Sequence, residues 1–148
     1  MRALVQRVIN AKITVESPPY EASIANGLCV FLGVEEGDDQ NIAMWIAKKL
    51  ANLRVFRDDQ GKMNCSILDI QGEILLISQF TLAGDCSKGN RPSFIRAAKP
   101  ELAEPLVTIV GELLQTEHNI SVKTGIFGAM MNIELNNDGP VTLLLERS

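Results

Sequence analysis

The chain has 148 residues, 46 % of them hydrophobic and 22 % charged, and its formal net charge is −4 at pH 7. This length and composition are typical of one globular domain, expected over residues 1–148. The apolar runs are far shorter than the roughly 20 residues that cross a bilayer, so we expect a cytoplasmic protein without membrane contacts. The acidic balance argues against a broad electrostatic grip on nucleic acid, and no DNA partner is expected.

Hydrophobic periodicity predicts strands at both ends of the chain and two helices between them. Asn26-Gly27 is a strong hairpin signal between two of these strands. Pro105 fits the second helix only if that helix begins late enough to place it in the first turn. In chain order we expect strands over 1–8, 11–16, 20–25 and 28–34, a helix capped by Asp38 or Asp39, a strand entered from 52–56, a strand over 73–80, a helix over 100–117, and strands over 120–123, 131–135 and 141–146.

This order of elements predicts an α/β fold. Strands come as hairpins at both ends, with helical crossovers between them. We therefore expect a mixed, curved, barrel-like sheet of about eight or nine strands, covered by two main helices.

The cysteines and the single histidine argue against a metal site. Cys29, Cys65 and Cys86 are widely spaced, and His118 is the only histidine. A zinc site needs three or four suitable ligands, so no metal and no cofactor are expected. Cys29 lies in an apolar strand, where it is expected to be a small core residue.

Conventional catalytic patterns are also missing. The chain has no G-x-S-x-G elbow, no P-loop and no G-x-G-x-x-G motif, and any Ser-His-Asp triad would depend on His118 at a helix end. Polar residues do follow the strongly apolar strand near 73–80, in the segment Ser78-Gln79-Phe80-Thr81-Leu82. Ser78 or Thr81 could be a nucleophile, but the sequence names no base to activate it. Hydrogen bonding at the strand end remains the alternative.

Four basic residues gather within twelve positions, at Lys88, Arg91, Arg96 and Lys99. Two interpretations stay open at this point. The segment is a solvated loop, or it is a local phosphate-facing patch for RNA.

Gly139-Pro140 lies between two β-rich runs. Neither residue has a polar side chain, so any chemistry at this position uses backbone groups. Glycine adopts φ and ψ values closed to other residues, and proline fixes its own φ and lacks an N–H. The bond before a proline can also be cis, which is rare elsewhere.

Several segments together give the chain a family resemblance that covers essentially its whole length. The Ser-Gln-x-Thr and Gly-Pro segments are the most specific of them. The chain resembles the D-aminoacyl-tRNA deacylases through Met1–Val8, Gly61–Asn64, Ser78–Leu82, Gly89–Phe94 and Asn137–Thr142. One departure is the proline-rich stretch Ser17-Pro18-Pro19-Tyr20, which affects only the shape of an early loop.

The resemblance implies a homodimer that acts on aminoacyl-tRNA. In such a dimer, Gly139 and Pro140, joined by a cis bond, would enter the partner's pocket beside its Ser-Gln-x-Thr strand. Their carbonyls would grip the α-amino group and occupy the space of an L side chain, so that D-amino acids, and glycine as well, are accepted.

The resemblance also implies roles for other residues. The catalytic segment would be Ser78, Gln79, Phe80 and Thr81, with backbone N–H groups around Gln79 and Phe80 stabilising the oxyanion and the ribose 2′-hydroxyl assisting the water. Arg7 matches a position that holds the Gly-Pro loop. Met130, with Met131, is expected against the terminal adenine, and charge alone places Lys88, Arg91 and Arg96 near the acceptor stem.

Two competing interpretations remain. The first keeps the fold but makes Gly139-Pro140 trans, which would open the pocket to an L-amino acid such as alanine. The second is a non-catalytic nucleic-acid-binding protein on the same scaffold.

Overall fold

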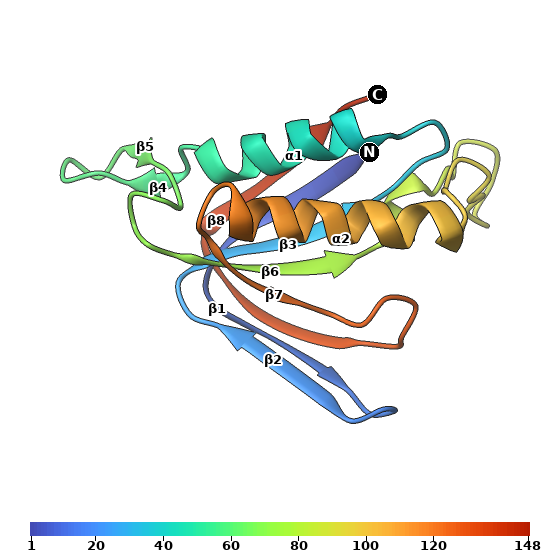
Figure 1. Ribbon diagram of the computed structural model, residues 1–148, viewed down its shortest axis with the longest axis horizontal. Helices are drawn as coiled ribbons and strands as arrows, with labels where there is room; N and C mark the ends of the chain where they lie inside the picture. Colours follow the sequence, from blue (N-terminus) through green and yellow to red (C-terminus); the bar gives the residue numbers. More distant parts are fainter.

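The computed structural model describes residues 1–148 (Figure 1). It contains eight strands, two α-helices and one short 3₁₀ helix, which agrees with the expected α/β class and strand number. Neither α-helix is long and apolar enough to cross a membrane. The elements are β1 (Arg2–Val15), β2 (Tyr20–Ile24), β3 (Gly27–Gly33), α1 (Gln40–Asn52), β4 (Phe56–Arg57), β5 (Met63–Cys65), β6 (Glu73–Ser78), η1 (Phe80–Ala83), α2 (Pro100–Thr116), β7 (Ser121–Thr124) and β8 (Asn132–Glu146).

Strand β1 organises the sheet. The prediction of separate strands over 1–8 and 11–16 was wrong, because β1 runs without a break through Asn10. β8 pairs antiparallel with one edge of β1 along almost its whole length, and it likewise joins the predicted strands 131–135 and 141–146 into one. On the other edge, β2 pairs with the second half of β1 and β3 with the first half.

The predicted hairpin at Asn26-Gly27 was wrong for a related reason. β2 and β3 both run antiparallel to β1, so the chain turns back at residues 16–19 and then passes straight through Asn26. Gly27 is required there because a Cβ would collide with the backbone of Glu73 in β6. The glycine therefore serves a close approach of two strands.

The centre of the sheet is parallel and apolar on both faces. β3 pairs parallel with β6, and β6 pairs parallel with β7. Leu28, Val30 and Leu32 of β3 point to the main core, while Cys29 belongs to a smaller core on the opposite face. This explains the continuous apolar runs in the sequence, as buried parallel strands lack polar alternation.

The two α-helices lie side by side over one face of the sheet (Figure 1). Asp39 caps α1 by accepting a hydrogen bond from the Ile42 amide over 2.9 Å, as predicted for Asp38 or Asp39. Ile46 and Leu50 of α1 are fully buried, and each such side chain contributes about 1.5–3 kcal/mol through burial. α2 begins at Pro100, as the expected range of 100–117 has it, so Pro105 lies inside the helix and the alternative of a later start, with Pro105 in the first turn, does not apply.

The sheet curves strongly, which brings β2 round towards β7. The hydroxyl of Tyr20, at the start of β2, donates to the carbonyl of Thr124 in β7 over 2.8 Å. Ile13, Ile24 and Ile77 pack inside this curve in the smaller core.

Candidate active site

The polar segment after β6 turns sharply away from the sheet. Ser78 ends the strand, and Phe80 begins the 3₁₀ helix η1, so the prediction that the strand continues to Phe80 was wrong. Ser78 and Gln79 are partly buried, whereas Phe80 and Thr81 are exposed. The segment thus presents polar groups at the edge of an otherwise apolar core.

Hydrogen bonds decide which backbone amides of this segment are free. The Gln79 amide donates to the carbonyl of Leu32 in β3 over 2.8 Å, so it is not available to a ligand. Phe80 and Thr81 are the first residues of η1, and their amides have no carbonyl within the turn to bond. Among the amides around Gln79 and Phe80, those of Phe80 and Thr81 are the ones free to bind an oxyanion.

The Thr81 hydroxyl is engaged with its neighbour. It accepts a hydrogen bond from Nε2 of Gln79 over 2.5 Å. No histidine or carboxylate is hydrogen-bonded to the hydroxyl of Ser78 or Thr81. A nucleophile activated by a base therefore has no support in the geometry.

A cavity of about 560 Å³ opens next to this segment, between the start of α2 and the β7–β8 connection. Its walls are mainly apolar, and the Met130 side chain is 92 % exposed at its edge. The lining contains Ser78, Gln79, Phe80 and Met130, whereas Thr81, expected in the same segment, lies outside it. The lining residues that the sequence did not single out include Val34, Ala98, Ala103, Phe127 and Ile133.

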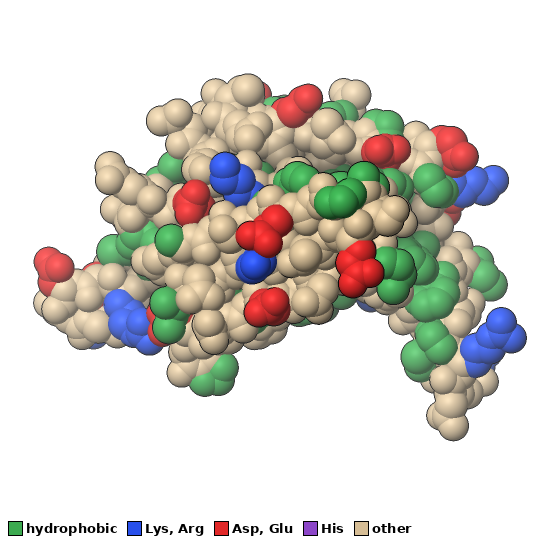
Figure 2. Space-filling view, turned by 90° about the horizontal axis from the view of Figure 1, so that it is seen from below, with side chains coloured by type: hydrophobic (Ala, Val, Ile, Leu, Met, Phe, Trp, Pro, Cys, Tyr) green, Lys and Arg blue, Asp and Glu red, His purple; other side chains and the backbone are tan.

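An aromatic pair stands beside the cavity. The rings of Phe80 and Phe94 meet edge to face, with centroids 5.1 Å apart. Both rings are partly exposed, as is usual for aromatic side chains that stack on a ligand. Figure 2 shows hydrophobic side chains around a hollow at one end of the molecule, next to a lobe that carries Lys or Arg side chains.

The predicted RNA-facing residues Lys88, Arg91 and Arg96 are exposed on the loop between η1 and α2. None of them lines the cavity, although Ala98 at the end of the same loop does. Arg96 already has a partner, because its Nη2 lies 2.9 Å from Oε1 of Glu35. Lys88 and Arg91 form no ion pair, so their charge is available to a ligand.

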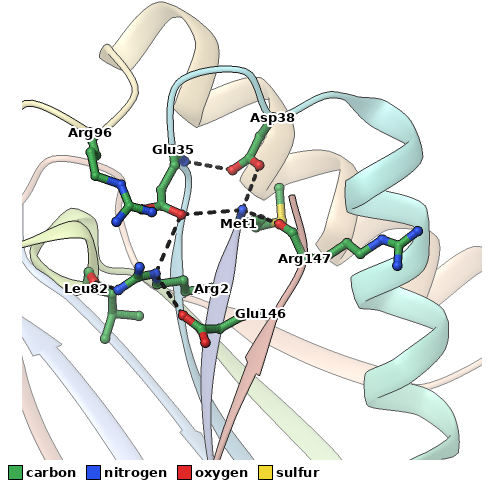
Figure 3. Close-up of polar contacts among 8 residues, drawn as sticks. All are labelled: Met1, Arg2, Glu35, Asp38, Leu82, Arg96, Glu146 and Arg147. Atoms are coloured by element: carbon green, nitrogen blue, oxygen red, sulfur yellow. Dashed lines mark hydrogen bonds and ion pairs between the residues drawn. The ribbon is translucent and has the colours of Figure 1, made fainter.

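Glu35 belongs to a partly buried ionic cluster that anchors η1 (Figure 3). Its Oε2 lies 3.5 Å from Nε of Arg2, and Nη1 of Arg2 donates to the carbonyl of Leu82 in η1 over 3.1 Å. The amino group of Met1 lies 2.6 Å from Oδ1 of Asp38 in the same cluster. These contacts hold η1, and therefore the Phe80 and Thr81 amides, in place from outside the cavity.

Gly139 and Pro140 lie in a bulge of β8. The β1–β8 register passes from Gln6 opposite Thr142 to Val8 opposite Asn137, so residues 138–141 face Arg7 alone. The Gly139–Pro140 bond is cis, which confirms the expectation from the resemblance, and Gly139 has φ of +153°. Both residues are exposed, and neither lines the cavity of its own chain.

Arg7 holds this bulge, as the resemblance implied. Its side chain is only 3 % exposed. Nε donates to the carbonyl of Asp138 over 2.8 Å, and Nη1 donates to the carbonyl of Val55 over 2.5 Å. The guanidinium thereby ties β8 to the chain just before β4.

The structure adds three residues to the site that the sequence did not assign. Oδ1 of Asn137 accepts from the Val141 amide over 2.8 Å, while its Nδ2 donates to Gln6 and back to the Val141 carbonyl. Asp138 and Arg57 form a two-point ion pair beside the bulge. Asn137 and Asp138 stood in a recognised segment, but no sequence pattern pointed to Arg57, 81 residues from its partner.

Comparison with known proteins agrees with this geometry. The family model described as D-Tyr-tRNA(Tyr) deacylase matches residues 4–146. A D-aminoacyl-tRNA deacylase of Geobacillus sp. (strain WCH70) is 52 % identical over 99 % of this chain and 95 % of its own length. The corresponding protein of Thermus aquaticus is 49 % identical over 100 % of this chain and 96 % of its own.

Solved structures show the same fold. One titled c-Myc DNA Unwinding Element Binding Protein superposes with a TM-score of 0.92 at 41 % identity, over 100 % of this chain and 99 % of that chain. A second, titled as a probable eukaryotic D-amino acid tRNA deacylase, has a TM-score of 0.83 at 14 % identity, over 97 % of both chains, and supports the fold alone. The match over residues 4–146 and the full-length relatives near 50 % identity decide the family. The chain belongs to the D-Tyr-tRNA(Tyr) deacylase family and is an enzyme of the hydrolase class.

Proposed function

We propose that this protein hydrolyses the ester bond of D-aminoacyl-tRNA, and of glycyl-tRNA, to release the free amino acid and tRNA. The observation that carries the proposal is the pairing of two features in one chain. One is a cavity beside free amides at η1, and the other is an exposed Gly139-Pro140 bulge held from behind by Arg7. The cavity and the free amides suit the ester group and its nucleoside, and the carbonyls of the Gly139-Pro140 bulge suit the α-amino group.

The apolar cavity fits the terminal adenosine of tRNA. Phe80, Phe127 and Met130 offer surfaces to a flat base, and base stacking on aromatic side chains is a common mode of RNA recognition. Lys88 and Arg91 are free to meet the phosphates of the acceptor end. The cavity suits a single-stranded 3′ end better than a duplex, because it is a pocket.

The amides of Phe80 and Thr81 would stabilise the oxyanion of the tetrahedral intermediate. In the reaction, a water oxygen attacks the ester carbonyl carbon, and the ribose oxygen leaves with a proton. The neighbouring ribose hydroxyl would position the water, since no protein base is hydrogen-bonded to Ser78 or Thr81. An aminoacyl ester is already activated, so this modest assistance suffices.

A second copy of the chain completes the site in this proposal. Gly139 and Pro140 do not line the cavity of their own chain, so they would act in the cavity of a partner within a homodimer. The β1–β8 register leaves both residues without a partner residue on β1, which leaves their carbonyls for an ammonium group. Carbonyls in that place would also fill the space of an L side chain, whereas glycine has no side chain to exclude.

Deacylation of matched D-tyrosyl-tRNA and L-tyrosyl-tRNA tests the proposal. We expect release of tyrosine from the D-ester and not from the L-ester. Release from both would contradict the chiral filter, and release from neither would contradict the activity. Glycyl-tRNA in the same assay tests the expected acceptance of glycine, and its resistance would contradict that part.

DNA binding is the second candidate, because the structure with a TM-score of 0.92 bears a DNA-binding title. The net charge of −4 speaks against it, since non-specific DNA binding relies on phosphate neutralisation. Salt-dependent DNA binding without hydrolysis of any aminoacyl-tRNA would favour this candidate. Binding of both nucleic acids with hydrolysis of only the D-ester would leave the deacylase as the primary function.

A further inference from the structure

The bulge that carries Gly139 and Pro140 needs support from outside its own sheet. Residues 138–141 face only Arg7 across the β1–β8 ladder, so regular strand pairing does not fix their position. Asn137 closes the base of the bulge through Val141. A further contact comes from β4, whose Arg57 binds Asp138 although β4 does not pair with β8.

Arg57 of β4 contacts Asp138 at two points. Nη1 lies 3.0 Å from Oδ2 and Nη2 lies 3.2 Å from Oδ1, which is the parallel geometry that arginine alone among the basic residues provides. Nε of Arg7 lies 3.3 Å from the same Oδ2, so the carboxylate bridges two guanidinium groups. The hydrogen bond from Arg57 is the main cause that lowers the pKa of Asp138, so the pair is charged at neutral pH.

We propose that Arg57 and Asp138 are positioning residues that set where the Gly139 and Pro140 carbonyls lie, and thereby how strictly the enzyme rejects L-amino acids. Asp138 directly precedes Gly139, so a shift of its backbone carries the two carbonyls with it. Arg7 holds the backbone carbonyl of Asp138, and Arg57 holds both oxygens of its carboxylate. This inference rests on the proposed function, in which those carbonyls select the enantiomer.

The pair acts on position far more than on stability. The Arg57 side chain is half exposed, and exposed ion pairs contribute little to the free energy of unfolding. The reaction rate depends more strongly than stability on such a contact, since small displacements at a reacting centre change rates by orders of magnitude. Loss of the pair should therefore alter selectivity in a protein that stays folded.

Five variants test the inference: Arg57→Gln, Asp138→Asn, their double variant, Arg57→Lys and the control Arg54→Gln. Arg54→Gln is a matched control because it removes the same charge three residues earlier in the chain. The guanidinium of Arg54 binds Asn64 and not the bulge. The measurement is kcat/KM for D-tyrosyl-tRNA and L-tyrosyl-tRNA, with thermal unfolding of each variant. Arg57→Lys is added because lysine restores the charge without the two-point contact.

We expect the D-to-L ratio of kcat/KM to fall about tenfold in each single variant. The double variant should fall no further than Asp138→Asn, because Asp138→Asn already removes the ion pair that Arg57→Gln breaks. Arg57→Lys should lie between Arg57→Gln and the unmodified protein, and Arg54→Gln should keep the full ratio. An unchanged ratio in both single variants, or losses that multiply in the double variant, would overturn the inference and leave the proposed function intact. Absence of D selectivity in the unmodified protein would overturn the proposed function, and this inference with it.

Discussion

Nε of Arg7 donates to the carbonyl oxygen of Asp138 over 2.8 Å, although the two residues are 131 positions apart in the chain. This contact crosses from β1 to the one part of β8 where strand pairing fails. A buried guanidinium thus replaces the ladder hydrogen bonds that the bulge lacks.

Replacement of Arg7 is expected to destabilise the protein as well as the bulge. Arg7→Ala leaves the Val55 and Asp138 carbonyls without their donor, which should lower the free energy of unfolding by about 3 kcal/mol. Urea unfolding measures the change. Arg54→Ala is the control, because an exposed arginine away from the bulge should change stability by less than about 0.5 kcal/mol. Equal stability of the two variants would contradict the assigned contacts.

Gly139→Ala is expected to reduce hydrolysis of the D-ester by about 100-fold. A Cβ at this position would lie 2.7 Å from the Val141 amide nitrogen and 3.2 Å from Nη2 of Arg7, at a φ of +153° that L side chains rarely adopt. The bulge must therefore shift. Gly61→Ala is the matched control, because Gly61 also has positive φ but its Cβ would meet nothing within 4 Å. Similar losses in both variants would show that global destabilisation, and not the bulge, is responsible.

Thr81→Ala is expected to retain substantial activity, within about tenfold of the unmodified protein. Its hydroxyl only accepts a bond from Gln79, whereas the variant keeps the backbone amide that would bind the oxyanion. Steady-state deacylation of D-tyrosyl-tRNA is the measurement. A loss of about three orders of magnitude would instead support Thr81 as the nucleophile.

The three cysteines should react with a thiol reagent at very different rates. Cys86 is exposed and Cys65 is partly buried, whereas desolvation by burial raises the pKa of the Cys29 thiol to about 12. Because the thiolate is the reactive form, Cys29 should stay unlabelled at pH 8 until the protein unfolds. Mass spectrometry of peptides after brief alkylation tests this order. Early labelling of Cys29 would contradict its place in the core.

The contribution of Asp138 to stability should vanish at low pH. Its pKa is lowered in the folded protein, first by the hydrogen bond from Arg57 and also by the charge of Arg7. A lowered folded-state pKa means that the stabilisation is complete above the ordinary value of 3.8 and is lost as the pH falls through the folded value. The difference in Tm between the unmodified protein and Asp138→Asn should thus be constant from about pH 9 to pH 5 and shrink towards pH 3. A difference that grows on acidification would contradict the charged pair.

Local chemistry in the sequence determined much of this protein. The period of apolar residues predicted the helices and most strands, and Asp39 indicated the start of α1. The Gly-Pro and Ser-Gln-x-Thr segments indicated the family, and with it Ser78, Gln79, Phe80 and Gly139. These signals are local, because periodicity, capping and turn chemistry involve residues a few positions apart.

Only the tertiary structure decided how those pieces meet. Gly27 looked like part of a hairpin, but a neighbouring strand that no local pattern reports requires it. The Gln79 amide looked free until β3 supplied the Leu32 carbonyl as its partner. Arg57 carried no signal at all, since its role depends on a carboxylate 81 residues away. Strand pairing, amide availability and ion pairs join groups that are distant in the chain, so they exist only once the chain has folded.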